Sequence, residues 1–171
     1  CAAGRVEAGP AELVGRVVFC LHPHQDVFNA PVSMLAPVPE AVPPRRATLA
    51  ANMETALNAL WDSGAGPGDR IVVVGAGVVG LMVAGLAGRI PGVDLTVVDV
   101  AEERRGIAES LGARFLAAGT GAHAPDGMPH DADVVFHTSV SAEGLNLAIA
   151  SAGQEATIVE LSWYGDRQVD V

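Results

Sequence analysis

Three glycines constrain this chain more than any other feature of its sequence: Gly75, Gly77 and Gly80, spaced as G-x-G-x-x-G. The β-branched run 71–74 directly precedes the first glycine, and the largely apolar segment 78–89 contains the last. A short β-branched run between charged residues and glycine predicts a strand buried on both faces, as in a parallel sheet. We therefore expect a strand, a tight turn and a helix in direct succession.

The glycine spacing in this context indicates a dinucleotide-binding site. Gly75 allows the tight turn, Gly77 leaves room for a pyrophosphate against the backbone, and Gly80 lets the helix lie close to the sheet. Unpaired N–H groups at the helix start would face the phosphates. Asp99 follows about 20 residues later, at the end of a second expected strand, where a carboxylate can accept hydrogen bonds from the adenosine ribose. In the alternative interpretation, the glycines only form turns and the acid is a solvated strand end.

The rest of the sequence alternates helical and strand patterns. Helices are expected over 49–60, 102–111 and 142–152, and strands over 95–99, 132–137 and 156–161. Ser141 has the character of an N-cap for the last of these helices. Strands that alternate with helices predict an α/β fold, here a Rossmann-type, doubly wound parallel sheet with right-handed crossovers.

The first 44 residues follow a different pattern. Residues 15–21 are typical of a short strand. Five prolines between residues 31 and 44 disfavour a helix there and favour extended chain. We therefore place a domain boundary here, with a small β-rich piece and its linker in residues 1–44 and the dinucleotide-binding domain in residues 45–171.

Composition excludes several classes of protein. Half of the 171 residues are hydrophobic and the mean hydropathy is +0.34, so the chain is not a disordered one. The net charge of −10 disfavours nucleic acid and anionic membranes as partners. Segment 71–87, the longest apolar stretch, is too short and too rich in glycine for a membrane span. Two cysteines and no visible signal peptide indicate a cytoplasmic location. Because the chain begins with Cys1 rather than Met, we expect it to be part of a longer protein.

Three further groups of residues carry weaker signals. His22 and His24 flank a proline and could form a metal pair with Cys20, although an exposed loop with ordinary histidines is the simpler interpretation. Glu54 is either a solvated helical residue or a group that faces a cleft. Arg104 lies either on a solvated helix face or beside the nucleotide.

The sequence resembles the cofactor domain of the medium-chain dehydrogenase superfamily, which includes the zinc-type alcohol and sorbitol dehydrogenases. The segments that carry the resemblance are 56–81, 99–113, 133–136 and 161–165. They match the family's first helix, glycine turn, terminal acid, second helix with its Leu-Gly-Ala ending, and later strands. The resemblance implies that residues 14–39 are the end of the family's GroES-like catalytic domain, most of which would precede Cys1.

The resemblance also implies roles for individual residues. The pyrophosphate would be held by Gly75, Gly77, Val78, Val79 and Gly80. The adenosine ribose would be held by Asp99, with Arg104 nearby. The nicotinamide half would be bordered by Thr55, Thr138 and Ser139. The implied activity is that of an NAD(H)-dependent oxidoreductase that moves a hydride between nicotinamide and a small alcohol or carbonyl substrate; no catalytic residue is identified.

Zinc is left open as a second cofactor. Aligned through 56–68, the chain carries Ala51 where zinc-type members have a cysteine or an acid as the last protein ligand, and Glu54 stands one helical turn along. The family's four-cysteine lobe is also missing. We therefore expect the isolated chain to bind NADH but not to turn over an alcohol.

The sequence leaves two other functions open and also predicts an oligomeric state. The main alternative is a non-catalytic NAD-binding sensor or regulatory module, and a methyltransferase is a third possibility that fits the glycine spacing poorly. Segment 168–171 resembles the start of an edge strand through which family members pair, so we expect a homodimer.

Overall fold

The computed structural model describes residues 1–119 and 124–165. It divides into two compact units, Cys1–Met53 and Glu54–Val171. Because this division falls inside helix α2 (Ala50–Ser63), it does not test the domain boundary that we place after residue 44, which stays a prediction.

The first unit is built on a three-stranded antiparallel sheet. Its strands are β1 (Ala2–Arg5), β2 (Val17–Cys20) and β3 (Leu35–Pro37), in that order. Strand β2 confirms the strand expected over 15–21, whereas β1 and β3 were not expected. β3 lies in the proline-rich stretch and tolerates Pro37 because it is an edge strand. A 3₁₀ turn (Val32–Met34) precedes β3, and a short helix, α1 (Pro44–Ala47), follows.

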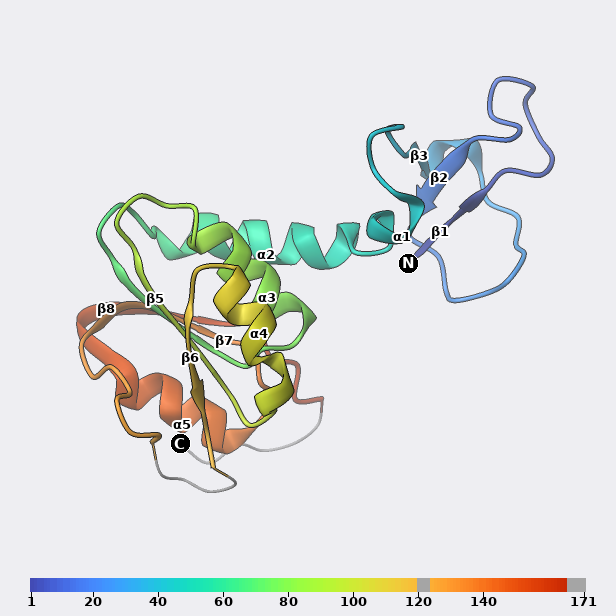
Figure 1. The fold of residues 1–171 in the computed structure, drawn as a ribbon. Coiled ribbons are helices and arrows are strands. Elements are labelled where there is room, and N and C mark those ends of the chain that lie inside the picture. Colours follow the sequence, from blue (N-terminus) through green and yellow to red (C-terminus); the bar gives the residue numbers. More distant parts are fainter. Residues whose placement is uncertain (120–123, 166–171) are drawn as a thin grey trace. The chain divides into compact units, whose positions relative to one another are not determined.

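The second unit contains the predicted parallel sheet (Figure 1). Its strands are β4 (Arg70–Val74), β5 (Asp94–Asp99), β6 (Arg114–Ala117), β7 (Ala132–His137) and β8 (Ala152–Glu160). Their order across the sheet is β6-β5-β4-β7-β8, and every neighbouring pair is parallel. Strands β5 and β6 therefore lie on one side of β4, and the later strands β7 and β8 lie on its other side. This places the reversal of strand order between β4 and β7.

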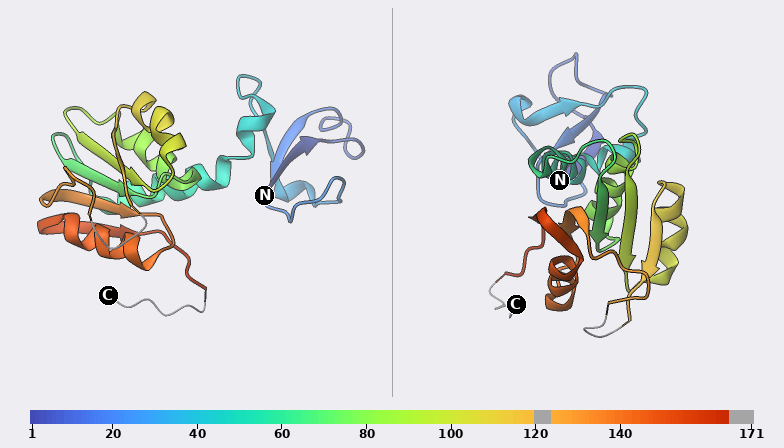
Figure 2. Two further views of the ribbon diagram at one scale, coloured as in Figure 1. Left: turned by 60° about the horizontal axis from the view of Figure 1, so that its bottom comes forward. Right: turned by 90° about the vertical axis from the view of Figure 1, so that its left-hand side faces the viewer.

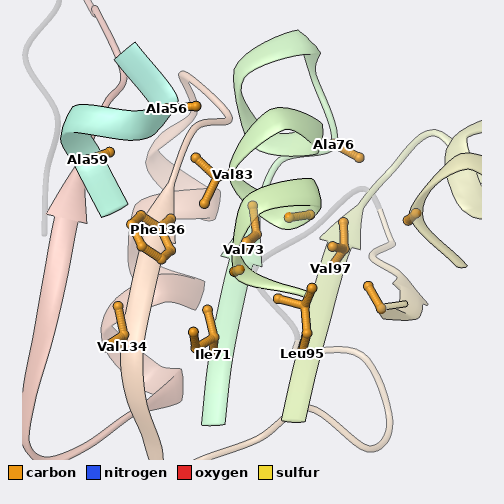
Figure 3. Close-up of a cluster of buried hydrophobic side chains, with 14 of the residues drawn as sticks. Ala56, Ala59, Ile71, Val73, Ala76, Val83, Leu95, Val97, Val134 and Phe136 are labelled. Atoms are coloured by element: carbon orange, nitrogen blue, oxygen red, sulfur yellow. The ribbon is translucent and has the colours of Figure 1, made fainter. Parts of the chain in front are cut away.

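Helices cover both faces of this sheet (Figure 2). On one face lie α2, α3 (Val78–Ala87) and α4 (Arg105–Ser110), and on the other lies α5 (Ala142–Ser151). Alternate residues of β4 point to the two faces, so Val73 packs in the first core (Figure 3), whereas Val72 packs in the second. Both are fully buried, which explains why this strand is apolar over residues 71–74.

Several local predictions can be compared with these elements. Ser141 does cap α5, because its hydroxyl oxygen accepts a hydrogen bond from the Gly144 N–H at 2.9 Å. The helix expected over 102–111 is divided into a 3₁₀ turn (Glu102–Arg104) and α4. Strand β6 was not expected from the sequence; its backbone forms hydrogen bonds with the edge of β5. Among the helices of the described residues, none is both long and apolar enough to cross a membrane.

Candidate dinucleotide-binding site

A cavity of about 700 Å³ opens at the carboxyl ends of β4, β5 and β7. It lies where the strand order reverses, which is where open parallel sheets bind their ligands. Six of the ten predicted cofactor residues line it: Gly75, Gly77, Asp99, Arg104, Thr138 and Ser139. The lining that the sequence did not indicate consists of Val74, Val98, Val100, Ala101, Ala118, Gly119, Ser141, Glu143, Gly144 and Leu147.

Gly75 makes the sharp turn out of β4. Its φ of +105° lies in the region that favours glycine, and a Cβ there would lie 2.7 Å from the Thr138 hydroxyl oxygen. That hydroxyl donates to the carbonyl oxygens of Gly75 (2.8 Å) and Val74 (3.1 Å). Thr138 therefore ties the glycine turn to the end of β7, at the floor of the cavity.

The other two glycines of the motif meet different surroundings. A Cβ on Gly80 would overlap the carbonyl oxygen of Gly75, so this position requires glycine for the close approach of α3 to the turn. A Cβ on Gly77 would have only Arg104 Nη1 within 4 Å, at 3.9 Å, because the space beside it belongs to the cavity. The structure thus separates a packing glycine from a glycine that leaves room for a ligand.

Asp99 lies at the end of β5, on the wall of the cavity. Its Oδ1 accepts a hydrogen bond from the Ala101 N–H at 2.7 Å, and its Oδ2 accepts one from the Ala76 N–H. Arg104 Nη1 lies 3.5 Å from Oδ2, and the arginine side chain is 41% exposed against 10% for the acid. Since each carboxylate oxygen has two lone pairs, Asp99 can still accept hydrogen bonds from a ribose.

The remaining predicted residues lie outside the lining of the cavity. Val78, Val79 and Gly80 form the first turn of α3, whose backbone N–H groups have no partner within the helix. Such a turn attracts phosphate through its N–H groups and its dipole. Thr55 is exposed on α2, and its predicted place beside nicotinamide stays a prediction.

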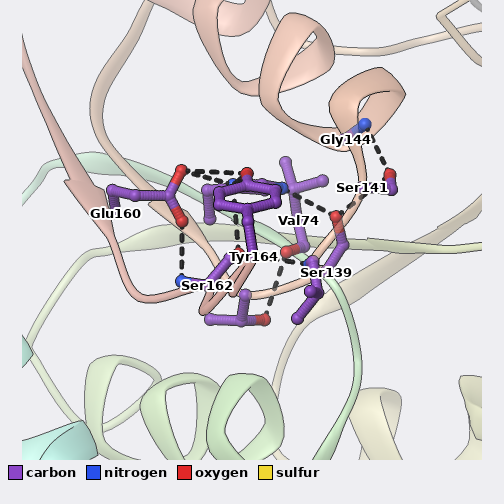
Figure 4. Close-up of polar contacts among 10 residues, drawn as sticks. Val74, Ser139, Ser141, Gly144, Glu160, Ser162 and Tyr164 are labelled. Carbon is purple, nitrogen blue, oxygen red and sulfur yellow. Dashed lines mark hydrogen bonds and ion pairs between the residues drawn. The ribbon is translucent and has the colours of Figure 1, made fainter. Parts of the chain in front are cut away.

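A polar cluster around one buried histidine, beside the cavity, was missed by the sequence analysis (Figure 4). His137, the last residue of β7, is fully buried. Its Nε2 lies 2.7 Å from Ser139 Oγ, and its Nδ1 lies 2.7 Å from Glu160 Oε2. The Tyr164 hydroxyl and Ser162 Oγ lie 3.2 and 3.3 Å from the same Nδ1. The only available signal in the sequence was a histidine directly after the apolar run 134–136.

Hydrogen bonding sets the charge of this cluster. Burial by itself would raise the pKa of Glu160, but hydrogen bonds from His137 and from the Ser162 N–H lower that pKa below its ordinary value. The carboxylate is therefore ionised at neutral pH, and its Oε2 can accept a hydrogen bond from Nδ1–H of His137. In the neutral tautomer of His137 that has its proton on Nδ1, Nε2 accepts a hydrogen bond from the Ser139 hydroxyl.

The residues described do not by themselves form a zinc site. Within 1–119 and 124–165, no three His, Cys, Asp or Glu side chains are grouped closely enough to hold a metal ion. His22 stacks on Phe28 with ring centroids 3.8 Å apart, and Cys20 is buried. Glu54, one helical turn along α2 from Ala51 at the expected ligand position, is exposed.

The sheet order, the flanking helices and the glycine turn at the switch point define a Rossmann-type domain. No protein-family model matches the chain. Over 95 residues it is 37% identical to an uncharacterized zinc-type alcohol dehydrogenase-like protein of Haemophilus influenzae, which covers 54% of this chain and 27% of that protein. The resemblance seen in the sequence is therefore confirmed by comparison with a known protein.

Solved structures agree on the fold. Galactitol-1-phosphate dehydrogenase of Escherichia coli superposes with a TM-score of 0.76 at 16% identity, covering 99% of this chain and 60% of its own. Acetophenone reductase of Geotrichum candidum, solved in complex with NAD, superposes with a TM-score of 0.64 at 22% identity. The match covers 74% of this chain and 36% of the reductase chain. The chain thus spans about a quarter of the curated relative and between about a third and three fifths of these enzymes.

Proposed function

We propose that this chain is the cofactor-binding part of an NAD(H)-dependent oxidoreductase, cytoplasmic and active on a small alcohol or carbonyl compound. The observation that carries the proposal is the cavity at the switch point, which has Gly77 on one wall and the carboxylate of Asp99 on another. A glycine open to the ligand and an acid at the end of the next strand are what a dinucleotide requires. The zinc-type dehydrogenase-like relative supports the same reaction class.

The residues of the cavity fit NAD in a definite order. Asp99 accepts hydrogen bonds from the adenosine ribose, and the pyrophosphate lies over Gly77 and the first turn of α3. The nicotinamide half extends toward Thr138 and Ser139 at the end of β7. The bound cofactor supplies the hydride chemistry, while this chain binds and orients it.

The groups that hold the substrate oxygen come, in this proposal, from parts of such enzymes that the chain does not span. The proposed division into residues 1–44 and 45–171 assigns the first segment to the end of the catalytic domain. A homodimer is also proposed, although segment 168–171, on which that expectation rests, lies outside the described residues.

Calorimetric titration of the 171-residue chain tests the proposal directly. NADH is expected to bind, and S-adenosylmethionine is the comparison ligand because methyltransferases also use a glycine loop and an acid. Binding of S-adenosylmethionine without binding of NADH would overturn the proposed function. A parallel assay with NAD, zinc and a panel of alcohols and polyols is expected to show no turnover. Robust turnover would show that the catalytic groups lie within these residues.

A further inference from the structure

A continuous chain of hydrogen bonds leads from the cavity to the outer end of β8. It begins at Ser139, which lines the cavity, passes through the buried ring of His137 and ends at Glu160, whose side chain is 37% exposed. Both links measure 2.7 Å. The three residues come from the ends of two neighbouring strands and the loop after the first of them, so the sheet itself aligns them.

This series of hydrogen bonds determines whether the Ser139 hydroxyl donates or accepts toward the cavity. Glu160 Oε2, 2.7 Å from Nδ1, favours the neutral tautomer of His137 that carries its proton on Nδ1, and in that tautomer Nε2 is an acceptor. Ser139 must then donate its hydroxyl proton to Nε2, and its oxygen presents lone pairs to the cavity. The hydroxyl oxygen of Ser141 lies 3.4 Å from that of Ser139.

Helix α5 holds the Ser139 hydroxyl in this position. A Cβ on Gly144 would overlap Ser139 Oγ and would lie 2.8 Å from His137 Nε2. The helix backbone therefore packs directly against the serine–histidine pair, and the hydroxyl cannot rotate toward α5. An acceptor that is held in one orientation loses less entropy on binding than a mobile one.

We propose that His137 and Glu160 are positioning residues that hold Ser139 as a hydrogen-bond acceptor for the nicotinamide nucleoside half of the cofactor. The ligand chemistry is that of a donor, either a ribose hydroxyl or the carboxamide N–H. This inference rests on the proposed function, because it assumes that a dinucleotide occupies the cavity. It predicts that the three residues distinguish NADH from a ligand that lacks the nicotinamide nucleoside.

Two substitutions of His137 separate its two hydrogen bonds. In His137→Asn the amide can replace Nδ1 and reach Glu160, but nothing accepts the proton of Ser139. In His137→Gln the longer side chain can replace Nε2 and accept that proton. Ser139→Ala removes the proposed acceptor. Ser110→Ala is the control, because it removes an exposed hydroxyl on α4 that donates to the Ile107 carbonyl oxygen and does not line the cavity.

The measurement is the dissociation constant of NADH and of ADP for each variant of the 171-residue chain, by calorimetry. ADP contains the adenosine and the diphosphate but no nicotinamide nucleoside. Loss of one oriented hydrogen bond is expected to raise the NADH constant about tenfold in Ser139→Ala and His137→Asn. The ADP constant should stay within about twofold throughout, and His137→Gln and Ser110→Ala should bind NADH like the parent.

The outcomes separate the two proposals. If the parent chain binds neither NADH nor ADP, the proposed function fails. If it binds both and the ratio of the two constants is unchanged in Ser139→Ala, the role of Ser139 is wrong. If His137→Asn and His137→Gln give the same ratio, an acceptor in place of Nε2 does not position Ser139, and the proposed role of His137 is wrong. Thermal unfolding monitors whether each variant folds, and Ser139→Ala decides the question if the histidine variants do not.

Discussion

The carboxylate of Asp99 accepts a hydrogen bond from the backbone N–H of Ala76, inside the glycine turn that follows β4. The end of β5 is thereby joined to the turn between β4 and α3. The same carboxylate faces the cavity, with Arg104 3.5 Å away. One side chain thus stabilises the turn and presents negative charge where the adenosine ribose is proposed to bind.

This position of Asp99 predicts a preference for NADH over NADPH. A 2′-phosphate on the ribose would approach the carboxylate, and two unit charges about 4 Å apart repel by roughly 4 kcal/mol at an effective dielectric of about 20. Solvent and Arg104 offset much of this repulsion. We expect the dissociation constant of NADPH to exceed that of NADH by about tenfold to a hundredfold, measured by calorimetry.

Two variants check the cause of that preference. Asp99→Asn keeps an oxygen that can accept from the turn but removes the charge, so the two constants should converge to within about threefold. Glu103→Gln, which removes a charge from an exposed residue that does not line the cavity, should leave the preference unchanged. Equal or tighter binding of NADPH by the parent chain would contradict the assignment.

Gly77→Ala is expected to reduce cofactor binding with little effect on folding. The φ of −68° at Gly77 is open to alanine, and the added Cβ would have only Arg104 Nη1 within 4 Å. The free energy of unfolding should therefore change by less than about 0.5 kcal/mol. The methyl group would fill space proposed for the pyrophosphate, so the NADH constant should rise by at least about tenfold. Urea denaturation and calorimetry on the same variant check both parts, and unchanged NADH affinity would count against this placement of the pyrophosphate.

Gly80→Ala is expected to act on stability instead. Its Cβ would overlap the Gly75 carbonyl oxygen and approach the Thr138 hydroxyl oxygen, so helix α3 or the turn must shift. Overpacking of this kind costs about 1–3 kcal/mol. Gly106→Ala in α4 is the matched control, because a Cβ there has open space around it and alanine favours a helix by about 1 kcal/mol over glycine. Urea midpoints that fall for Gly106→Ala, or do not fall for Gly80→Ala, would contradict the packing described.

Glu160 predicts a pH-dependent contribution to stability. Its pKa in the folded chain is lowered from an ordinary value of 4.5, so the unfolded chain binds the proton more readily. The stabilisation is therefore fully present above that ordinary value and is lost as the pH falls through the lower, folded pKa. In urea denaturation, the midpoint of the parent should exceed that of Glu160→Gln at pH 5.5. The difference between the two midpoints should become smaller as the pH is lowered toward 3.5.

A control tests whether this pH dependence belongs to Glu160. Glu54→Gln changes an exposed carboxylate on α2, and its small difference from the parent should not follow the same course with pH. If the gap between the parent and Glu160→Gln is the same at every pH, the pairing of Glu160 with His137 does not stabilise the fold.

The sequence by itself determined the central β4–α3–β5 unit and pointed to several residues that line the cavity at its end. Local spacing was sufficient, because the run 71–74, the three glycines and Asp99 lie within about 30 residues and each has a direct conformational consequence. The N-cap role of Ser141 was predictable for the same reason, since a cap acts on its own helix. Six predicted cofactor residues line one cavity because strands of a parallel sheet bring their carboxyl ends to one edge.

Only the tertiary structure decided the polar cluster behind that cavity. His137 and Glu160 are 23 residues apart and meet because β7 and β8 pair in parallel with these two residues in register. No local pattern specifies that register, since it depends on how the two strands align across helix α5. The overlap at Gly80 is a second example, because the close approach of α3 to the turn exists only once the helix has packed on the sheet. Residue types and short spacings thus defined the elements, whereas contacts between elements depended on packing that acts over the whole domain.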